Sequence, residues 1–63
     1  MSRVVATIHA TDHNGEAVEI DVWSDGDVAF THTGTATTVV VASEHMKALG
    51  TAARYAFELG ESC

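Results

Sequence analysis

The sequence contains no proline, one cysteine, three basic residues and four aromatic residues, and these scarcities exclude several classes of protein. A single cysteine, Cys63, cannot form an internal disulfide, and paired C-x-x-C zinc motifs are absent. The chain has no apolar run of about 18 residues and no basic start followed by an apolar core. We therefore predict neither a membrane span nor a secretory signal, and expect a cytoplasmic protein.

The scarcity of basic residues also bears on the partners of the chain. Nine acidic residues against three basic ones give a formal charge of -6. An acidic surface is repelled by phosphate backbones and by anionic lipid. Direct binding to nucleic acid or to a membrane is therefore disfavoured.

The length of the chain limits its hydrophobic core. The 63 residues can hold one domain, residues 1–63, and short chains bury a smaller fraction of their surface than long ones. Many of the hydrophobic residues are alanines, so large apolar side chains are few. Small domains usually compensate with disulfides, a structural metal or oligomerisation. We predict self-association, with a homodimer as the simplest form.

Alternation of apolar and other residues predicts four β-strands. The clearest is the second, in which Val18, Ile20 and Val22 share one face and Glu19 and Asp21 share the other. A period of two with this contrast is typical of an antiparallel sheet that has one buried face. The four predicted strands span residues 4–10, 16–23, 28–32 and 36–42.

Turn residues separate these strands. Asn14-Gly15 and Asp25-Gly26 tolerate the positive φ of tight hairpin turns, and Gly34 marks a third turn. The last strand is β-branched throughout its centre, which leaves open whether Val39 or its neighbour Val40 faces the core.

The stretch "SEHMKALGTAARYAFELG" predicts one helix over residues 43–60. Ser43 is placed to act as its N-cap and Gly60 as its C-cap. The predicted fold class is therefore α+β: a four-stranded antiparallel meander followed by one C-terminal helix packed on the sheet, in the order ββββα.

The predicted helix has one polar stripe and two apolar flanks. The polar stripe consists of Glu44, Lys47, Thr51, Arg54, Glu58 and Glu61. The first flank and the inward-facing strand residues form the predicted helix–sheet core, which consists of Met46, Leu49, Ala53, Phe57, Val18, Ile20, Val22, Val28 and Phe30. A single small sheet covers an apolar stripe of about 100°, so the second flank needs a different cover. This predicted dimer interface consists of Ala48, Ala52, Tyr55, Ala56 and Leu59.

Trp23 lies on the outward face of the second strand, among carboxylates. One interpretation is a cross-strand cluster with Val5 or Val40. The other is an anchor for a partner, since exposed tryptophan is enriched in binding hot spots. Trp23 therefore joins the predicted interface residues.

The carboxylates of the second hairpin also allow two interpretations. They keep an edge of the sheet soluble, or they dock a partner that has a basic surface. This crowded set consists of Glu16, Glu19, Asp21, Asp25 and Asp27.

Three histidines are candidate metal ligands. A meander brings His9, His13 and His32 to one edge of the sheet, where Asp12 or Glu16 could complete a tetrahedral set. Solvated surface histidines are the alternative, and the spacing is a weak metal signal. A chain this short offers no evident deep cleft in which a nucleophile and a base could meet. We therefore predict no catalytic residues, no metal site and no cofactor.

The segment "VVASEHMKALG" resembles the strand-to-helix junction of small actinobacterial regulator-associated proteins. The resemblance implies a partner of helix-turn-helix regulators that acts through protein contacts. Four strands followed by a pairing helix are also similar in order to the single-strand-binding domains of transcriptional coactivators, which need a basic groove with interleaved aromatics. The sequence thus predicts a small homodimeric interaction or regulatory adaptor module that is not an enzyme, with single-stranded nucleic acid binding as the alternative.

Overall fold

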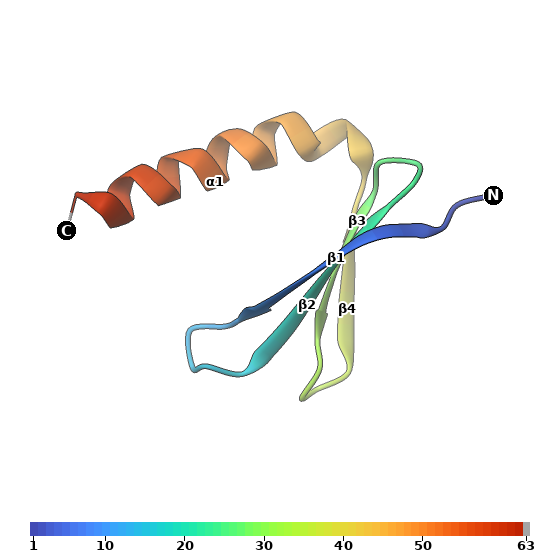
Figure 1. Ribbon diagram of the computed structural model, residues 1–63, viewed down its shortest axis with the longest axis horizontal. Coiled ribbons are helices and arrows are strands. Elements are labelled where there is room, and N and C mark those ends of the chain that lie inside the picture. The colour runs from blue at the N-terminus through green and yellow to red at the C-terminus, as the bar shows by residue number, and fades with distance from the viewer. Residues whose placement is uncertain (63) are drawn as a thin grey trace.

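The computed structural model describes residues 1–62, and Cys63 lies outside the described residues. Four strands form one open antiparallel sheet in the order β1-β2-β3-β4, and a helix follows them (Figure 1). The predicted ββββα fold class is confirmed. The elements are β1 (Val4–Thr11), β2 (Ala17–Trp23), β3 (Val28–His32), β4 (Thr37–Val41), a 3₁₀ turn η1 (Ser43–His45) and α1 (Met46–Glu61).

The register gives the sheet one apolar face. Ile8 pairs with Ile20, Ile20 with Phe30, and Phe30 with Val39, so one apolar row crosses all four strands. Residues directly opposite each other share a face, which places Val39 with this row and Val40 on the other side. We call this side the apolar sheet face; its apolar residues are Ala6, Ile8, Ala10, Val18, Ile20, Val22, Val28, Phe30, Val39 and Val41, and His32 and Thr37 lie at its end beside the third turn.

Two glycines with positive φ make the first two turns possible. Gly15 has φ +83° and Gly26 has φ +96°, in the region that side chains with a Cβ rarely adopt. The third turn spans residues 33–36 and includes Gly34, as predicted, and its positive φ of 55° falls on Ala36.

The ends of the helix differ from the prediction. Ser43 makes no side-chain cap hydrogen bond; it begins η1, and its backbone N–H donates to Asp27 Oδ1 at 2.8 Å. The α-helix continues past Gly60 to Glu61, and Ser62 occupies the C-cap position. A carboxylate from the β2–β3 turn therefore binds the amide at the point where the chain leaves the sheet.

The predicted helix–sheet core does not form within one chain. The helix leaves the end of β4 and extends sideways from the strands (Figure 1), and none of its residues is buried. Met46 is half-buried, whereas Leu49, Ala53 and Phe57 are exposed, Phe57 by 62%.

On the sheet, burial is confined to the third strand. Val28 and Ala29 are the buried hydrophobic residues among residues 1–62, with 9% and 6% exposure. The other predicted core residues of the sheet, Val18, Ile20, Val22 and Phe30, are half-buried.

The direction of the helix has a local cause. A single residue, Ala42, separates β4 from η1, and the Asp27 carboxylate binds the following amide. This short junction aims α1 away from the strands, so the flank that begins at Met46 does not lie flat on its own sheet.

Candidate functional site

The face of the sheet opposite the apolar sheet face carries a hollow around Trp23. We call this side the outer face. The hollow has a volume of about 350 Å³. Its lining includes the acidic residues Asp21, Asp25 and Asp27 together with Trp23, Ala29 and Val40.

Strand register and one tight turn place these side chains. Asp21 pairs with Ala29, and Ala29 pairs with Val40, so the three residues form a row across β2, β3 and β4. Trp23 is the last residue of β2, and its N–H donates to Asp27 O at 2.9 Å. The turn therefore holds its acidic residues next to the tryptophan.

The carboxylates of the hollow are fixed by hydrogen bonds. Asp25 accepts from the Asp27 N–H and from the Ser2 hydroxyl, each at 3.0 Å, and these two donors hold the pKa of Asp25 below its ordinary value. Asp21 Oδ1 accepts from the Thr7 hydroxyl at 2.8 Å, and Asp27 Oδ1 accepts from the Ser43 N–H. Among residues 1–62 no hydrogen bond uses the Oδ2 atom of Asp21 or of Asp27. Hydrogen bonds therefore hold the acidic side chains of the hollow, and their remaining oxygens can accept further donors.

The position of Trp23 in this hollow bears on the two interpretations of its role. Trp23 is half-buried and lines the same space as Val40, which agrees with the interpretation of a cross-strand cluster with Val40. Val5 is not part of the lining; it lies at the irregularity of β1 between Val4 and Ala6. The role of Trp23 as an anchor for a partner stays a prediction.

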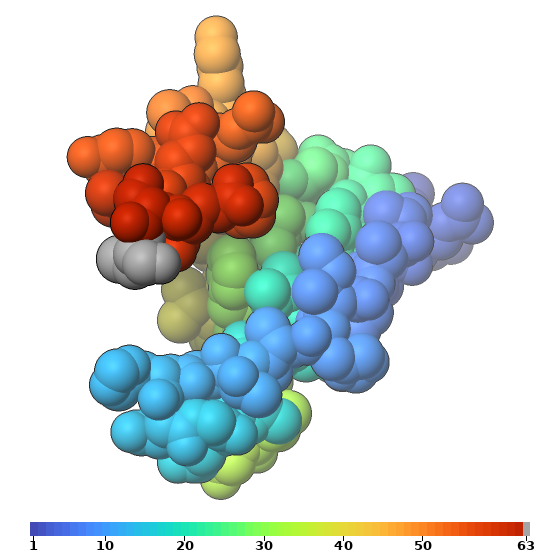
Figure 2. Space-filling model, turned by 60° about the vertical axis from the view of Figure 1, so that its left-hand side comes forward, coloured from blue at the N-terminus to red at the C-terminus, as the bar shows by residue number. Residues whose placement is uncertain are grey.

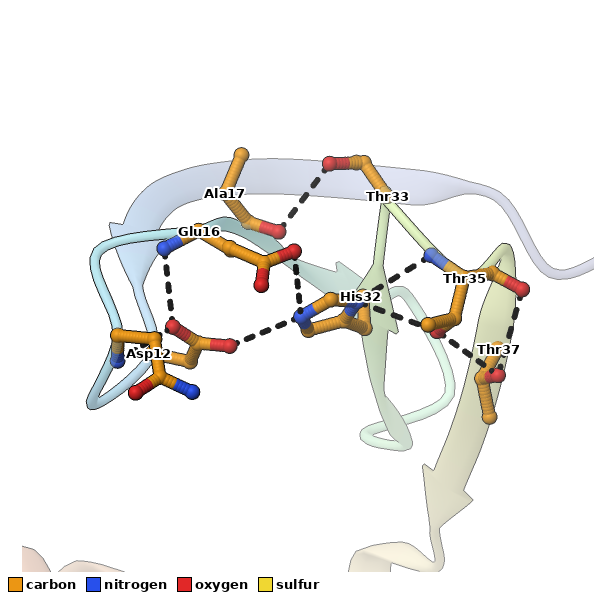
Figure 3. Close-up of polar contacts among 8 residues, drawn as sticks. Asp12, Glu16, Ala17, His32, Thr33, Thr35 and Thr37 are labelled. Carbon is orange, nitrogen blue, oxygen red and sulfur yellow. Dashed lines mark hydrogen bonds and ion pairs between the residues drawn. The ribbon is translucent and has the colours of Figure 1, made fainter.

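A second polar cluster lies at the opposite end of the sheet (Figure 3). His32 Nε2 lies 2.9 Å from Asp12 Oδ2 and 3.8 Å from Glu16 Oε2. Its Nδ1 accepts from the Thr35 N–H at 3.3 Å. Asp12 Oδ1 accepts from the N–H groups of Asn14 and Glu16. The cluster thus ties the first hairpin turn to the end of β3.

Only part of the predicted histidine group belongs to this cluster. Within residues 1–62, Asp12, Glu16 and His32 could each offer one ligand atom to a metal ion, and these atoms lie within 4.8 Å of one another. His9 pairs with Glu19 and so lies on the outer face, whereas His32 pairs with Val18 on the other side. His13 lies in the first turn, outside the group. Hydrogen bonding within the chain accounts for the cluster that does form.

Acid is expected to weaken this cluster. The Glu16 N–H and the His32 side chain lower the pKa of Asp12 from the ordinary 3.8. A lowered folded-state pKa contributes stability that is complete above 3.8 and is lost as the pH falls through the lowered pKa. Asp12→Asn, which keeps an oxygen for the turn, should lower Tm at neutral pH, and the deficit should shrink in acid. Thermal unfolding at a series of pH values, with Glu19→Gln as the control, measures this; a deficit that grows in acid contradicts it.

The predicted interface flank of the helix is exposed along its length. Tyr55 and Leu59 are 63% and 53% exposed, and the alanines beside them, Ala48, Ala52 and Ala56, are exposed as well. This flank stays a predicted interface.

Comparison with protein family models, with curated proteins and with solved structures finds no match. In the part of the chain that the structure describes, no helix combines the length and the hydropathy needed to cross a bilayer. The case for a function therefore depends on the geometry of this chain.

Proposed function

We propose that this chain is a small homodimeric protein-interaction module that docks a basic segment of a partner protein in the Trp23 hollow. The observation that carries this proposal is the combination of an indole, an apolar lining and three carboxylates in one space of about 350 Å³. An arginine or lysine places its alkyl stem on apolar surface and its charged head among acceptors. A cation over the face of a tryptophan gains a further attraction of about 0.5–2 kcal/mol.

The electrostatics of the outer face favour the same partner. Hydrogen bonds to Asp25 lower its pKa, so this carboxylate stays charged at neutral pH. The formal charge of -6 attracts basic segments over a distance of about 10 Å at moderate salt. The same carboxylates repel phosphate, which counts against the alternative of single-stranded nucleic acid. The resemblance at the strand-to-helix junction makes a transcriptional regulator our proposed partner.

Trp23, the only tryptophan of the chain, supplies the probe for this proposal. Titration with an arginine-rich peptide should change its emission in a saturable way, and added salt should weaken the binding. The same peptide with citrulline in place of arginine should bind much more weakly, because it lacks the charge.

A matched pair of variants distinguishes peptide binding in the hollow from general electrostatic attraction to the acidic chain. Asp21→Asn should weaken peptide binding roughly two- to fivefold, as expected for one partly exposed ion pair of about 0.5–1 kcal/mol. Glu19→Gln makes the same change in charge on the same strand, outside the hollow, and should leave affinity close to that of the unchanged protein. Equal losses in both variants, or tighter binding to an oligonucleotide than to the peptide, would overturn the proposal.

A further inference from the structure

The single chain exposes more surface than a compact protein of its mass. Its accessible surface is 4917 Å², whereas a folded monomer of 6.6 kDa exposes roughly 3,900 Å². The excess of about 1,000 Å² slightly exceeds the roughly 800 Å² that each partner buries in a protein–protein interface of standard size. The excess accessible surface of the chain is therefore about as large as the area that one partner buries in a standard interface.

The shape of the chain agrees with its surface. The radius of gyration is 12.9 Å, against about 10.6 Å for a compact domain of this length. An open notch separates α1 from the β1–β2 hairpin (Figure 2). The sheet and the helix are thus two bodies joined at one end.

The surplus surface is apolar on both bodies. On the apolar sheet face Ile8 and Val39 are 53% and 58% exposed, although they belong to the central apolar row. On the helix Phe57 is 62% exposed, on the flank that begins at half-buried Met46. In the single chain, therefore, the apolar sheet face is not covered by a helix, and the Phe57 flank of α1 is not covered by a sheet.

The charged groups of the chain lie at the edges of these surfaces. On the sheet, Asp12 and Glu16 approach His32, at the end of the apolar sheet face, to 2.9 and 3.8 Å. No carboxylate occupies a pairing position of the apolar sheet face, and the charged residues of α1 lie in the polar stripe. Two copies, each with a formal charge of -6, can therefore meet over the central apolar row of the sheet without placing carboxylates at the centre of the contact.

From these observations we infer that a second copy of the chain covers the apolar sheet face with its helix, and that the exchange is reciprocal about a twofold axis. The Phe57 flank of each α1 lies on the partner's sheet beside Ile8 and Val39. A closed twofold exchange covers the apolar sheet face and the Phe57 flank of both copies at once. This inference rests on the proposed homodimer and names the surfaces that form it, while the Trp23 hollow stays on the outer face.

Two measurements on the unchanged protein test the exchange. Light scattering should give twice the 6.6 kDa chain mass. In an equal mixture of carbon-13-labelled and unlabelled chains, filtered nuclear Overhauser spectra should show contacts between the Phe57 ring of one copy and the methyl groups of Ile8 and Val39 of the other. A folded protein of single-chain mass would overturn the inference, and so would a dimer in which Phe57 contacts neither residue across copies.

A pair of neighbouring substitutions repeats the test on the sheet. Ile8 and His9 are adjacent in β1 and lie on opposite faces, because they pair with Ile20 and Glu19. Ile8→Glu should reduce the measured mass to that of a single chain or abolish folding, whereas His9→Glu should keep the dimer. A folded Ile8→Glu dimer would exclude the exchange. Tryptophan emission measures peptide binding, whereas mass and Overhauser contacts measure the exchange. Failure of the exchange and failure of the docking function therefore give different results.

Discussion

Phe57→Glu is expected to abolish the dimer and, with it, most of the folded population. Phe57 is the largest exposed side chain on the flank that we place on the partner's sheet. Removal of a large buried aromatic side chain typically costs about 3–5 kcal/mol, and a buried carboxylate adds a desolvation penalty. Because the reciprocal dimer contains two Phe57 side chains, a loss of about 3 kcal/mol at each weakens association by roughly ten-thousandfold. Light scattering and far-ultraviolet circular dichroism, both followed over a range of protein concentrations, measure the two effects.

The control for this change is Thr51→Glu on the same helix. Thr51 belongs to the polar stripe, and its hydroxyl donates to Lys47 O within the helix. The substitution adds the same charge where water remains, so surface effects within about 0.5 kcal/mol and an intact dimer are expected. If both variants dissociate, net charge and not the flank controls assembly. If both stay dimeric, the Phe57 flank is not in the interface.

A third substitution on the helix examines its second flank. Tyr55 is 63% exposed beside the alanines of the predicted interface. If this flank meets the partner's helix at the twofold axis, Tyr55→Glu should dissociate the dimer as Phe57→Glu does. A Tyr55→Glu dimer with the Phe57 contacts intact would remove the alanine flank from the interface and leave the exchange in place.

Local patterns were sufficient to predict the sheet. Alternation in residues 17–23 reflects a strand with one apolar face, and the Asn14-Gly15 and Asp25-Gly26 pairs supply the positive φ that each hairpin turn uses. Both signals act over a few residues, so no knowledge of distant contacts is needed.

The position of the helix could not be predicted in the same way. The amphipathic pattern of residues 46–61 says that an apolar flank needs cover, but it does not say which chain provides the cover. In the structure the Asp27–Ser43 hydrogen bond and the one-residue link at Ala42 set the direction of α1. The sequence contains both features, yet their effect depends on how the strand register brings the β2–β3 turn to the end of β4.

The Trp23 hollow was partly predictable. The acidic residues of the second hairpin and the outward position of Trp23 are evident from alternation alone. The addition of Val40 to the hollow required the β3–β4 register, which a uniformly β-branched run does not determine. The polar cluster has the same limit. Asp12 in the first hairpin turn contacts His32 at the end of β3, but the register places His9 on the opposite face from His32.

Gly26→Ala is expected to produce the second large loss, through the junction that aims the helix. Gly26 has φ +96°, and an added Cβ would lie 2.9 Å from Ser43 Cβ. Ser43 cannot retreat freely, because its N–H is bound to Asp27 Oδ1 at 2.8 Å. Backbone strain of about 1–3 kcal/mol and overpacking of about 1–3 kcal/mol therefore act together. We expect a loss of roughly 2–6 kcal/mol, with each kcal/mol lowering Tm by about 4–8 °C for a domain of this size.

Gly15 offers a matched control, because it has φ +83° and open space where its Cβ would lie. Gly15→Ala suffers the backbone strain alone, so the difference in Tm between the two alanine variants isolates the contact with Ser43. Asparagine, which tolerates positive φ better than alanine, sharpens the comparison. Gly15→Asn should be nearly neutral, whereas Gly26→Asn should still collide with Ser43 and misdirect α1. All four variants need the same protein concentration, because assembly makes Tm depend on it. Equal losses of Tm at the two glycines would mean that Ser43 moves away from the added Cβ, and that the β2–β3 turn does not hold the helix in place.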